Sequence, residues 1–138
     1  MYKTNKLIIT IISLQLFFSL YSFADNKPDM LFFYSRDCEH CIEVKNEFLP
    51  GFLKRYQKHF NLVELEVSKL AYFDSLLTIE SRVNFPEEKK DFPAIYFMGT
   101  LIEGEMPIQN ELETVVKNYL ANPDSAKKVD REVMKKVP

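Results

Sequence analysis

The pattern of apolar and polar positions divides the first half of the chain into a strand, a helix and a second strand. Residues 30–35 form a continuous apolar run, which is typical of a strand buried on both faces. Over residues 42–56 the apolar positions recur at close to helical spacing, and Pro50-Gly51 predicts a kink or a break in this helix. Residues 62–67 partly alternate between apolar and polar, and they predict the second strand.

The second half of the chain continues with a helix and a hairpin. Residues 94–98 and 101–103 predict two strands joined by a tight turn at Gly99-Thr100. Gly104, directly after them, indicates a bulge or a close approach of the backbone. Before the hairpin, residues 70–83 predict a helix whose inner face consists of Leu70, Phe73, Leu76, Leu77 and Val83.

The last part of the chain predicts one further helix and a charged tail. Asn110 and Glu113 resemble a capping box, so the helix is expected to begin there and to end before Asn122-Pro123. Residues 124–138 fit either a last short helix or a disordered segment. The order strand–helix–strand–helix–strand–strand–helix predicts an α/β fold with a central mixed β-sheet flanked by helices.

The first 24 residues differ in character from the rest. Lys3 and Lys6 precede an apolar run over residues 7–20, and Ser22-Phe23-Ala24 resembles a small-x-small cleavage site. We interpret this segment as a secretory signal peptide; the alternative is an uncleaved anchor, although the run is short for about 30 Å of hydrocarbon. The protein is then periplasmic or secreted, with no stable membrane insertion after cleavage. The predicted organisation is a signal peptide over 1–24, one domain over 25–121 and a charged C-terminal tail over 122–138.

Composition narrows the possible partners. Of the 138 residues, 46% are hydrophobic and 28% are charged, which suits a single folded domain and gives no reason to expect disorder. The formal net charge is -2 and no long basic run is present, so nucleic acid is not an expected partner.

Cys38 and Cys41 are the only cysteines, and they form a C-x-x-C pair. A small exported domain stapled by disulfides would carry more of them, and a bridge across two residues closes too small a loop to stabilise the fold through chain entropy. The pair therefore suits redox chemistry. The alternatives are a zinc site that recruits His40 and His59, an inert structural disulfide, and two unrelated buried thiols.

Cys38 lies between a predicted strand and a predicted helix, which suits a nucleophilic thiol. The free N–H groups and the dipole at a helix N-terminus lower the pKa of a thiol. Cys41, about one turn later, can attack a mixed disulfide formed at Cys38. A protonated His40 would favour the thiolate and make the disulfide a better oxidant. Arg36 is a further nearby cation, and Glu39 would oppose the effect from solvent.

Residues 31–41, Phe92–Pro93 with the strand that follows, and Gly104 resemble the thioredoxin-like superfamily. The similarity of element order covers about residues 29–121. The resemblance implies a thioredoxin-like fold and a cis Phe92–Pro93 bond that faces the cysteines and binds substrate, with Pro86 as the competing proline.

Two features depart from the pattern of that superfamily. Phe32 stands where the family often has a buried acid, six residues before the first cysteine, so Glu43 or a water would have to serve in proton transfer. The chain also contains no tryptophan, and Tyr34 and Asp37 occupy the approach to the motif.

The resulting hypothesis is an exported thiol–disulfide oxidoreductase that exchanges disulfides with protein substrates and with a redox partner protein. Cys38, Cys41 and His40 are its expected catalytic residues, and Phe92 and Pro93 its expected substrate-binding residues. We expect a monomer with no cofactor and no metal site, and the direction of electron flow stays open. The alternatives are a non-catalytic thioredoxin-like binding, adaptor or redox-sensing domain, and a glutaredoxin-like use of glutathione.

Overall fold

The computed structural model of the protein describes residues 27–135 and residue 137. The signal peptide predicted over 1–24 lies outside these residues and stays a prediction. Within the described part of the chain, no helix combines the length and the apolar character needed to cross a membrane.

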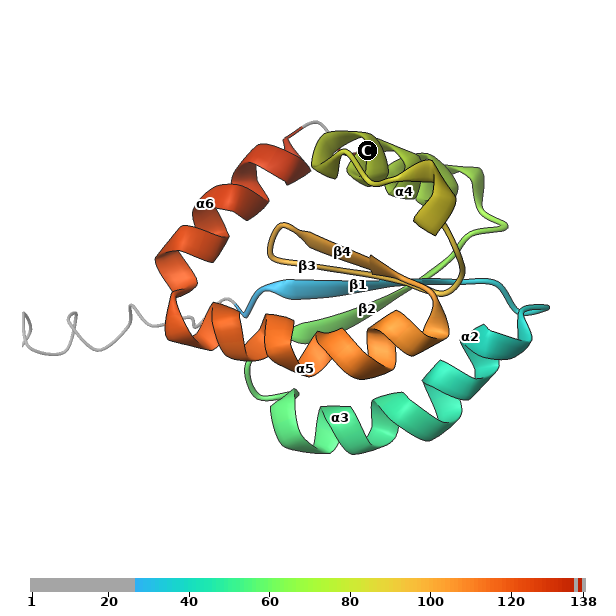
Figure 1. Ribbon diagram of the computed structural model, residues 1–138, viewed down its shortest axis with the longest axis horizontal. Coiled ribbons are helices and arrows are strands. Elements are labelled where there is room, and N and C mark those ends of the chain that lie inside the picture. The colour runs from blue at the N-terminus through green and yellow to red at the C-terminus, as the bar shows by residue number, and fades with distance from the viewer. Residues whose placement is uncertain (1–26, 136, 138) are drawn as a thin grey trace, which may run out of the picture.

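A four-stranded mixed sheet forms the centre of the molecule (Figure 1). Its strands are β1 (Asp29–Tyr34), β2 (Asn61–Glu66), β3 (Ala94–Phe97) and β4 (Thr100–Glu103). Their order across the sheet is β2-β1-β3-β4, with β1 parallel to β2 and antiparallel to β3, and with β3 and β4 forming an antiparallel hairpin. The predicted α/β class with a central mixed sheet is confirmed.

Helices cover both faces of the sheet. The α3 and α5 helices lie on one face, α4 lies on the other, and α6 leads from the end of α5 towards α4 (Figure 1). The helical elements are α2 (Glu39–Glu43), the π-helical turn η1 (Val44–Phe48), α3 (Leu49–Tyr56), α4 (Leu70–Val83), the 3₁₀ turn η2 (Glu87–Lys89), α5 (Glu105–Ala121) and α6 (Pro123–Met134).

Two apolar cores, one on each face, explain why β1 is a continuous apolar run. Neighbouring side chains of a strand point to opposite faces. Phe32 accordingly packs with the core under α3 and α5, whereas Phe33 packs with the core under α4, and both are fully buried. With both faces covered, β1 holds its carboxyl end, and the loop that follows it, in a fixed position.

The helical run after β1 is interrupted one turn earlier than the sequence predicts. A kink or break was expected at Pro50-Gly51, but the irregular segment is the π-helical turn η1, and α3 continues through both residues. Proline lacks an N–H and its ring clashes with the carbonyl four residues back. The turn before Pro50 therefore widens to accommodate the ring, while the proline itself sits in the first turn of α3.

The inner face of α4 differs from the predicted one. Leu70, Phe73 and Leu77 were expected inside, but they are 72%, 37% and 42% exposed. The buried positions are Ser75, Leu76, Ile79 and Glu80. Ser75 donates a hydrogen bond to the Ala71 carbonyl and Glu80 forms an ion pair with Lys90, so polar groups with partners occupy part of the inner face that hydrophobicity alone assigns to leucines.

The α5 helix begins earlier than the expected capping box. It opens at Glu105 with Gly104 as its N-cap, and Asn110 is an exposed residue in its interior, so the prediction of a cap at Asn110 is wrong. Pro107, in the first turn of the helix, was the available signal, because proline is tolerated at that end of a helix.

The tail that followed Asn122-Pro123 is helical rather than disordered over Pro123–Met134. Val133 is buried in the core under α4, and Asp130 accepts a hydrogen bond from the Tyr96 hydroxyl at 2.8 Å. The same hydroxyl accepts a hydrogen bond from the Gly99 N–H at 3.0 Å. The tail is thus fixed to the hairpin turn by both packing and hydrogen bonds.

Candidate functional site

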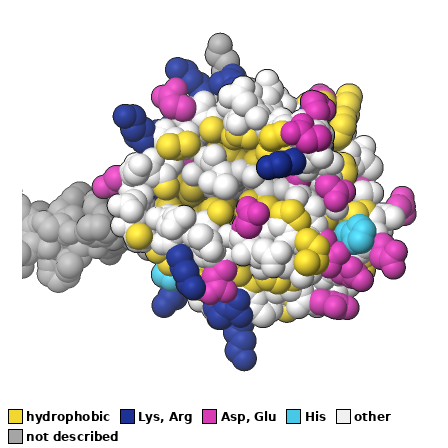
Figure 2. All heavy atoms as spheres, viewed as in Figure 1, with side chains coloured by type: hydrophobic (Ala, Val, Ile, Leu, Met, Phe, Trp, Pro, Cys, Tyr) yellow, Lys and Arg dark blue, Asp and Glu magenta, His cyan; other side chains and the backbone are white. Residues whose placement is uncertain are grey.

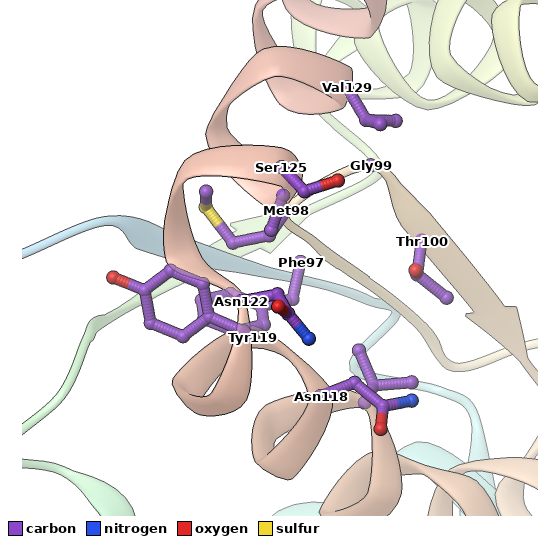
Figure 3. A pocket seen from close by; sticks show the side chains of 11 residues that line it. Phe97, Met98, Gly99, Thr100, Asn118, Tyr119, Asn122, Ser125 and Val129 are labelled. Atoms are coloured by element: carbon purple, nitrogen blue, oxygen red, sulfur yellow. The ribbon is translucent and has the colours of Figure 1, made fainter.

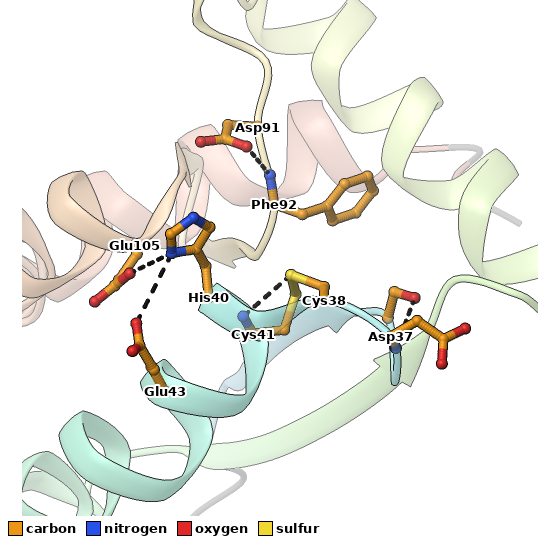
Figure 4. Close-up of a disulfide and its surroundings, with 9 residues drawn as sticks. Asp37, Cys38, His40, Cys41, Glu43, Asp91, Phe92 and Glu105 are labelled. Atoms are coloured by element: carbon orange, nitrogen blue, oxygen red, sulfur yellow. Dashed lines mark hydrogen bonds and ion pairs between the residues drawn. A yellow bond between two sulfur atoms is a disulfide. The ribbon is translucent and has the colours of Figure 1, made fainter.

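Cys38 and Cys41 lie at the carboxyl end of β1, where the chain leaves the sheet and enters the helical run (Figure 4). The two sulfurs form a disulfide, and the Cα atoms are 5.2 Å apart. Cys38 is the N-cap of α2, with extended backbone angles φ -95° and ψ 113°. The predicted placement of the pair between a strand and a helix is confirmed.

The backbone of α2 already supplies a donor to the Cys38 sulfur. The Cys41 N–H donates to Cys38 Sγ over 3.1 Å, which is the hydrogen bond that a side-chain N-cap normally makes. A thiolate at this position would accept the same N–H and would lie at the positive end of the helical run. The local geometry therefore favours the ionised form of Cys38 once the disulfide is reduced.

The two sulfurs differ in their access to solvent. Cys41 is 1% exposed and is the buried residue of α2, whereas Cys38 is only half-buried. Cys38 is therefore accessible from solvent, whereas Cys41 is shielded.

His40 is held by two carboxylates rather than lying free beside the sulfurs. Its Nδ1 is 2.6 Å from Glu105 Oε2 and 3.8 Å from Glu43 Oε2 (Figure 4). The hydrogen bond with Glu105 raises the pKa of His40, and the charges of Glu105, Glu43 and Asp91 act in the same direction. The sequence predicted His40 as a catalytic residue that would act on the thiol if protonated, but it gave no sign of its main partner, Glu105.

Ligand atoms of His40, Glu43 and Glu105 lie within 4.8 Å of one another, the one such group of potential metal ligands in the described part of the chain. The hydrogen bonds among these three side chains already account for their proximity: the pKa of Glu43 is raised mainly by its hydrogen bond with Glu105. The zinc site considered from the sequence has no geometric basis, because His59 follows the far end of the helical run, about 25 Å of helix from Cys38.

Acidic side chains gather at the end of the molecule where α2 begins, as Figure 2 shows. Three of the acids in this region make contacts at the motif or on the neighbouring loop: Glu43 and Glu105 contact His40, and Asp91 accepts the Phe92 N–H. Glu43, one of the two candidates for proton transfer at Cys41, is thus engaged with His40 and Glu105, while Phe32 is fully buried in the apolar core.

The expected cis Phe92–Pro93 bond is present, and it is the one cis peptide bond among the described residues. Pro93 is buried, and its carbonyl accepts the Gly104 N–H at 2.8 Å. Glu105 follows Gly104 and pairs with His40, so this contact connects the cis-proline turn to the C-x-x-C segment. Figure 4 shows the Asp91–Phe92 segment next to the motif, and the charge of Asp91 acts on His40.

Gly104 has to be a glycine for two reasons. Its φ is +89°, and a Cβ would lie 3.2 Å from Asp91 Oδ2 and 3.4 Å from Pro107 Cδ.

We expect Gly104→Ala to destabilise the protein by about 1–3 kcal/mol, measured by urea unfolding. Gly51→Ala is the matched control: it lies within α3 with no atom within 4 Å of its Cβ position, and it should stabilise by about 0.5–1 kcal/mol. Equal effects at the two positions would contradict this account of Gly104.

A buried acid pair behind the cis-proline turn was not predicted. Glu80 of α4 and Glu103 of β4 are each 5% exposed, and Lys90 Nζ lies 2.7 Å from Glu80 Oε2. Glu103 Oε2 accepts the Asp91 N–H at 2.9 Å. Burial, and then the charge of Glu80, raises the pKa of Glu103 to about 7 against the opposing effect of that hydrogen bond. The sequence could not predict this pair, because its two acids lie in separate elements, α4 and β4, and no local motif connects them.

A pocket at the other end of β3 is separate from this site (Figure 3). It lies beside the hairpin turn, and Met98, Gly99, Asn118, Asn122 and Val129 are among its lining residues. Pro93 precedes β3 and Met98 follows it, so the length of the strand separates the pocket from the cis-proline turn.

Comparison of the chain with protein-family models, with curated proteins and with solved structures found no match. The function is therefore argued from the geometry of Cys38, Cys41 and the residues around them.

Proposed function

We propose that this protein is an exported thiol–disulfide oxidoreductase with a thioredoxin-like fold. The observation that carries the proposal is the Cys38–Cys41 disulfide at the start of a helical run, with a half-exposed first sulfur that accepts a helix N–H and a buried second sulfur. An inert structural bridge needs neither this difference in exposure nor a donor aimed at one sulfur. The four-stranded mixed sheet with helices on both faces is compatible with the fold.

The reaction proceeds through a mixed disulfide. In the reduced protein the Cys38 thiolate attacks one sulfur of a substrate disulfide, and the other substrate sulfur leaves as a thiolate that takes up a proton. Cys41 loses its proton and attacks Cys38, which re-forms the intramolecular disulfide and releases the second substrate thiol. Two electrons pass from the protein to its substrate, and the reverse sequence oxidises a substrate dithiol.

Phe92 and Pro93 are proposed to bind the substrate segment next to its cysteine. Pro93 has no N–H, and the cis bond turns the chain so that the backbone of Phe92 is presented beside the motif. An extended substrate could pair with this backbone while its sulfur meets Cys38.

The proposed setting is the periplasm or the exterior of the cell, after removal of the signal peptide over residues 1–24. The protein would act as a monomer, and a partner protein would restore its redox state without a bound cofactor. An oxidising compartment suits a domain whose only two cysteines are joined.

The reduction potential is the measurement that tests the function and its direction. The 25–138 protein is equilibrated with glutathione buffers, and its redox state is read by alkylation and mass, because the chain contains no tryptophan. A value near about -120 mV would make it a donor of disulfides, and one near about -270 mV a reductant. Cys38→Ser is the control. If the cysteines show no reversible exchange in any of the buffers, the proposed enzymatic function is wrong, and a binding or adaptor domain takes its place.

A further inference from the structure

The geometry points to Glu105 as a positioning residue of the dithiol: through a direct hydrogen bond it fixes the side chain of His40, which stands between Cys38 and Cys41 in the motif. This inference rests on the proposed function and deepens it. Glu105 belongs to α5 and is 65 residues from His40 in the sequence, yet it makes the shortest polar contact of the histidine, 2.6 Å between Nδ1 and Oε2.

Glu105 is itself held in place by its surroundings. Its side chain is 19% exposed, and its Oε1 accepts the Gln109 Nε2–H at 2.9 Å from the next turn of α5. The residue before it, Gly104, donates its N–H to the Pro93 carbonyl. The carboxylate is therefore tied to the helix and to the cis-proline turn, whereas the His40 side chain is 62% exposed and has no comparable support of its own.

The arrangement determines where the charge of His40 acts. Figure 4 shows the imidazole reaching from the C-x-x-C segment to Glu105; His40 stands two residues after Cys38 and directly before Cys41, so its charge is carried within the motif itself. An imidazolium in this position favours the Cys38 thiolate, and a hydrogen-bonded carboxylate keeps the imidazole protonated to higher pH. The effect of His40 on the thiol then persists to higher pH than it would without Glu105.

The groups facing His40 come from three segments: Glu105 from α5, Glu43 from α2 and Asp91 from the loop before β3. Glu43 is farther from the imidazole, at 3.8 Å, and shares a hydrogen bond with Glu105. Of the three, Glu105 is the one whose removal takes away a direct hydrogen bond to the ring.

The test is an NMR titration of the His40 ring in the oxidised and the reduced protein. Glu105→Gln should lower the titration midpoint of His40 in both redox states. Reduction of the wild type should raise that midpoint, because a thiolate at Cys38 stabilises the imidazolium, and linkage requires the imidazolium to lower the pKa of Cys38 by the same amount. Glu111→Gln, an exposed glutamate on the same helix, is the matched control, and His59 is an internal reference in every spectrum.

Each outcome decides the inference. A midpoint that Glu105→Gln leaves unchanged, or moves no more than Glu111→Gln does, would overturn the role of Glu105. A midpoint that is the same in oxidised and reduced protein would show that His40 does not sense the Cys38 sulfur, and would reduce the ion pair to a structural contact. Chemically reduced protein suffices for these measurements, so a protein that exchanges no disulfides with substrates would fail the proposed function without changing them.

Discussion

Cys38→Ser is expected to reduce catalysed disulfide exchange to the uncatalysed rate, whereas Cys41→Ser should retain the first attack and accumulate mixed disulfides. In Cys38→Ser the remaining thiol is 1% exposed and cannot reach a protein substrate. In Cys41→Ser the half-exposed Cys38 still attacks, with its sulfur at the start of the helical run, but no second thiol is present to release the product.

The two variants are compared by insulin reduction and by non-reducing gels after incubation with a reducible protein substrate. Covalent complexes should appear with Cys41→Ser and be absent with both Cys38→Ser and the double variant. Loss of the bridge should change stability little, because it closes a loop over only three positions of sequence separation. Far-UV circular dichroism therefore serves as the folding control. Complexes formed by Cys38→Ser instead would reverse the two roles.

The parts of the fold that the sequence predicted are those with local signals. The continuous apolar run of β1 marks a strand covered on both faces, and the C-x-x-C pair after it marks the entry to a helix. The resemblance implied a cis bond, and the position of Phe92–Pro93 directly before the apolar β3 favoured this proline over Pro86; the structure places the cis bond there. In each case the determining residues are neighbours in the chain.

The parts that were missed depend on contacts between distant residues. Glu105 looks like an ordinary exposed glutamate until α5 brings it to His40. A hydrophobic pattern assigns Glu80 to the solvent-facing side of α4. In the structure Glu80 is buried and paired with Lys90, so the buried face of α4 is not the one predicted. Polar groups with partners of this kind can be buried at small net cost, and no periodicity reveals the partner.

The protein should lose stability as the pH rises through the range in which Glu103 ionises. The folded state holds the Glu103 proton up to a pKa of about 7, against an ordinary value of 4.5. The unfolded chain releases that proton at the lower pH, so between the two values the folded state binds more protons and the free energy of unfolding falls with increasing pH. A shift of this size corresponds to a loss of up to about 3 kcal/mol, complete near pH 8.

Glu103→Gln should remove this loss while preserving the contacts. The amide oxygen can accept the Asp91 N–H, and the amide NH₂ can donate to Glu80 as the protonated acid does. The variant should match the wild type in urea unfolding at pH 4, below the unfolded pKa, and exceed it at pH 8, with Glu111→Gln as an exposed control that changes neither value. Parallel pH profiles for wild type and Glu103→Gln would contradict this account. They would mean that the positive charge of Lys90 keeps Glu103 ionised as well as Glu80, so that Glu103 takes up no proton in this pH range. A flattened profile in Glu103→Gln would identify the ionisation of Glu103 as the source of the loss.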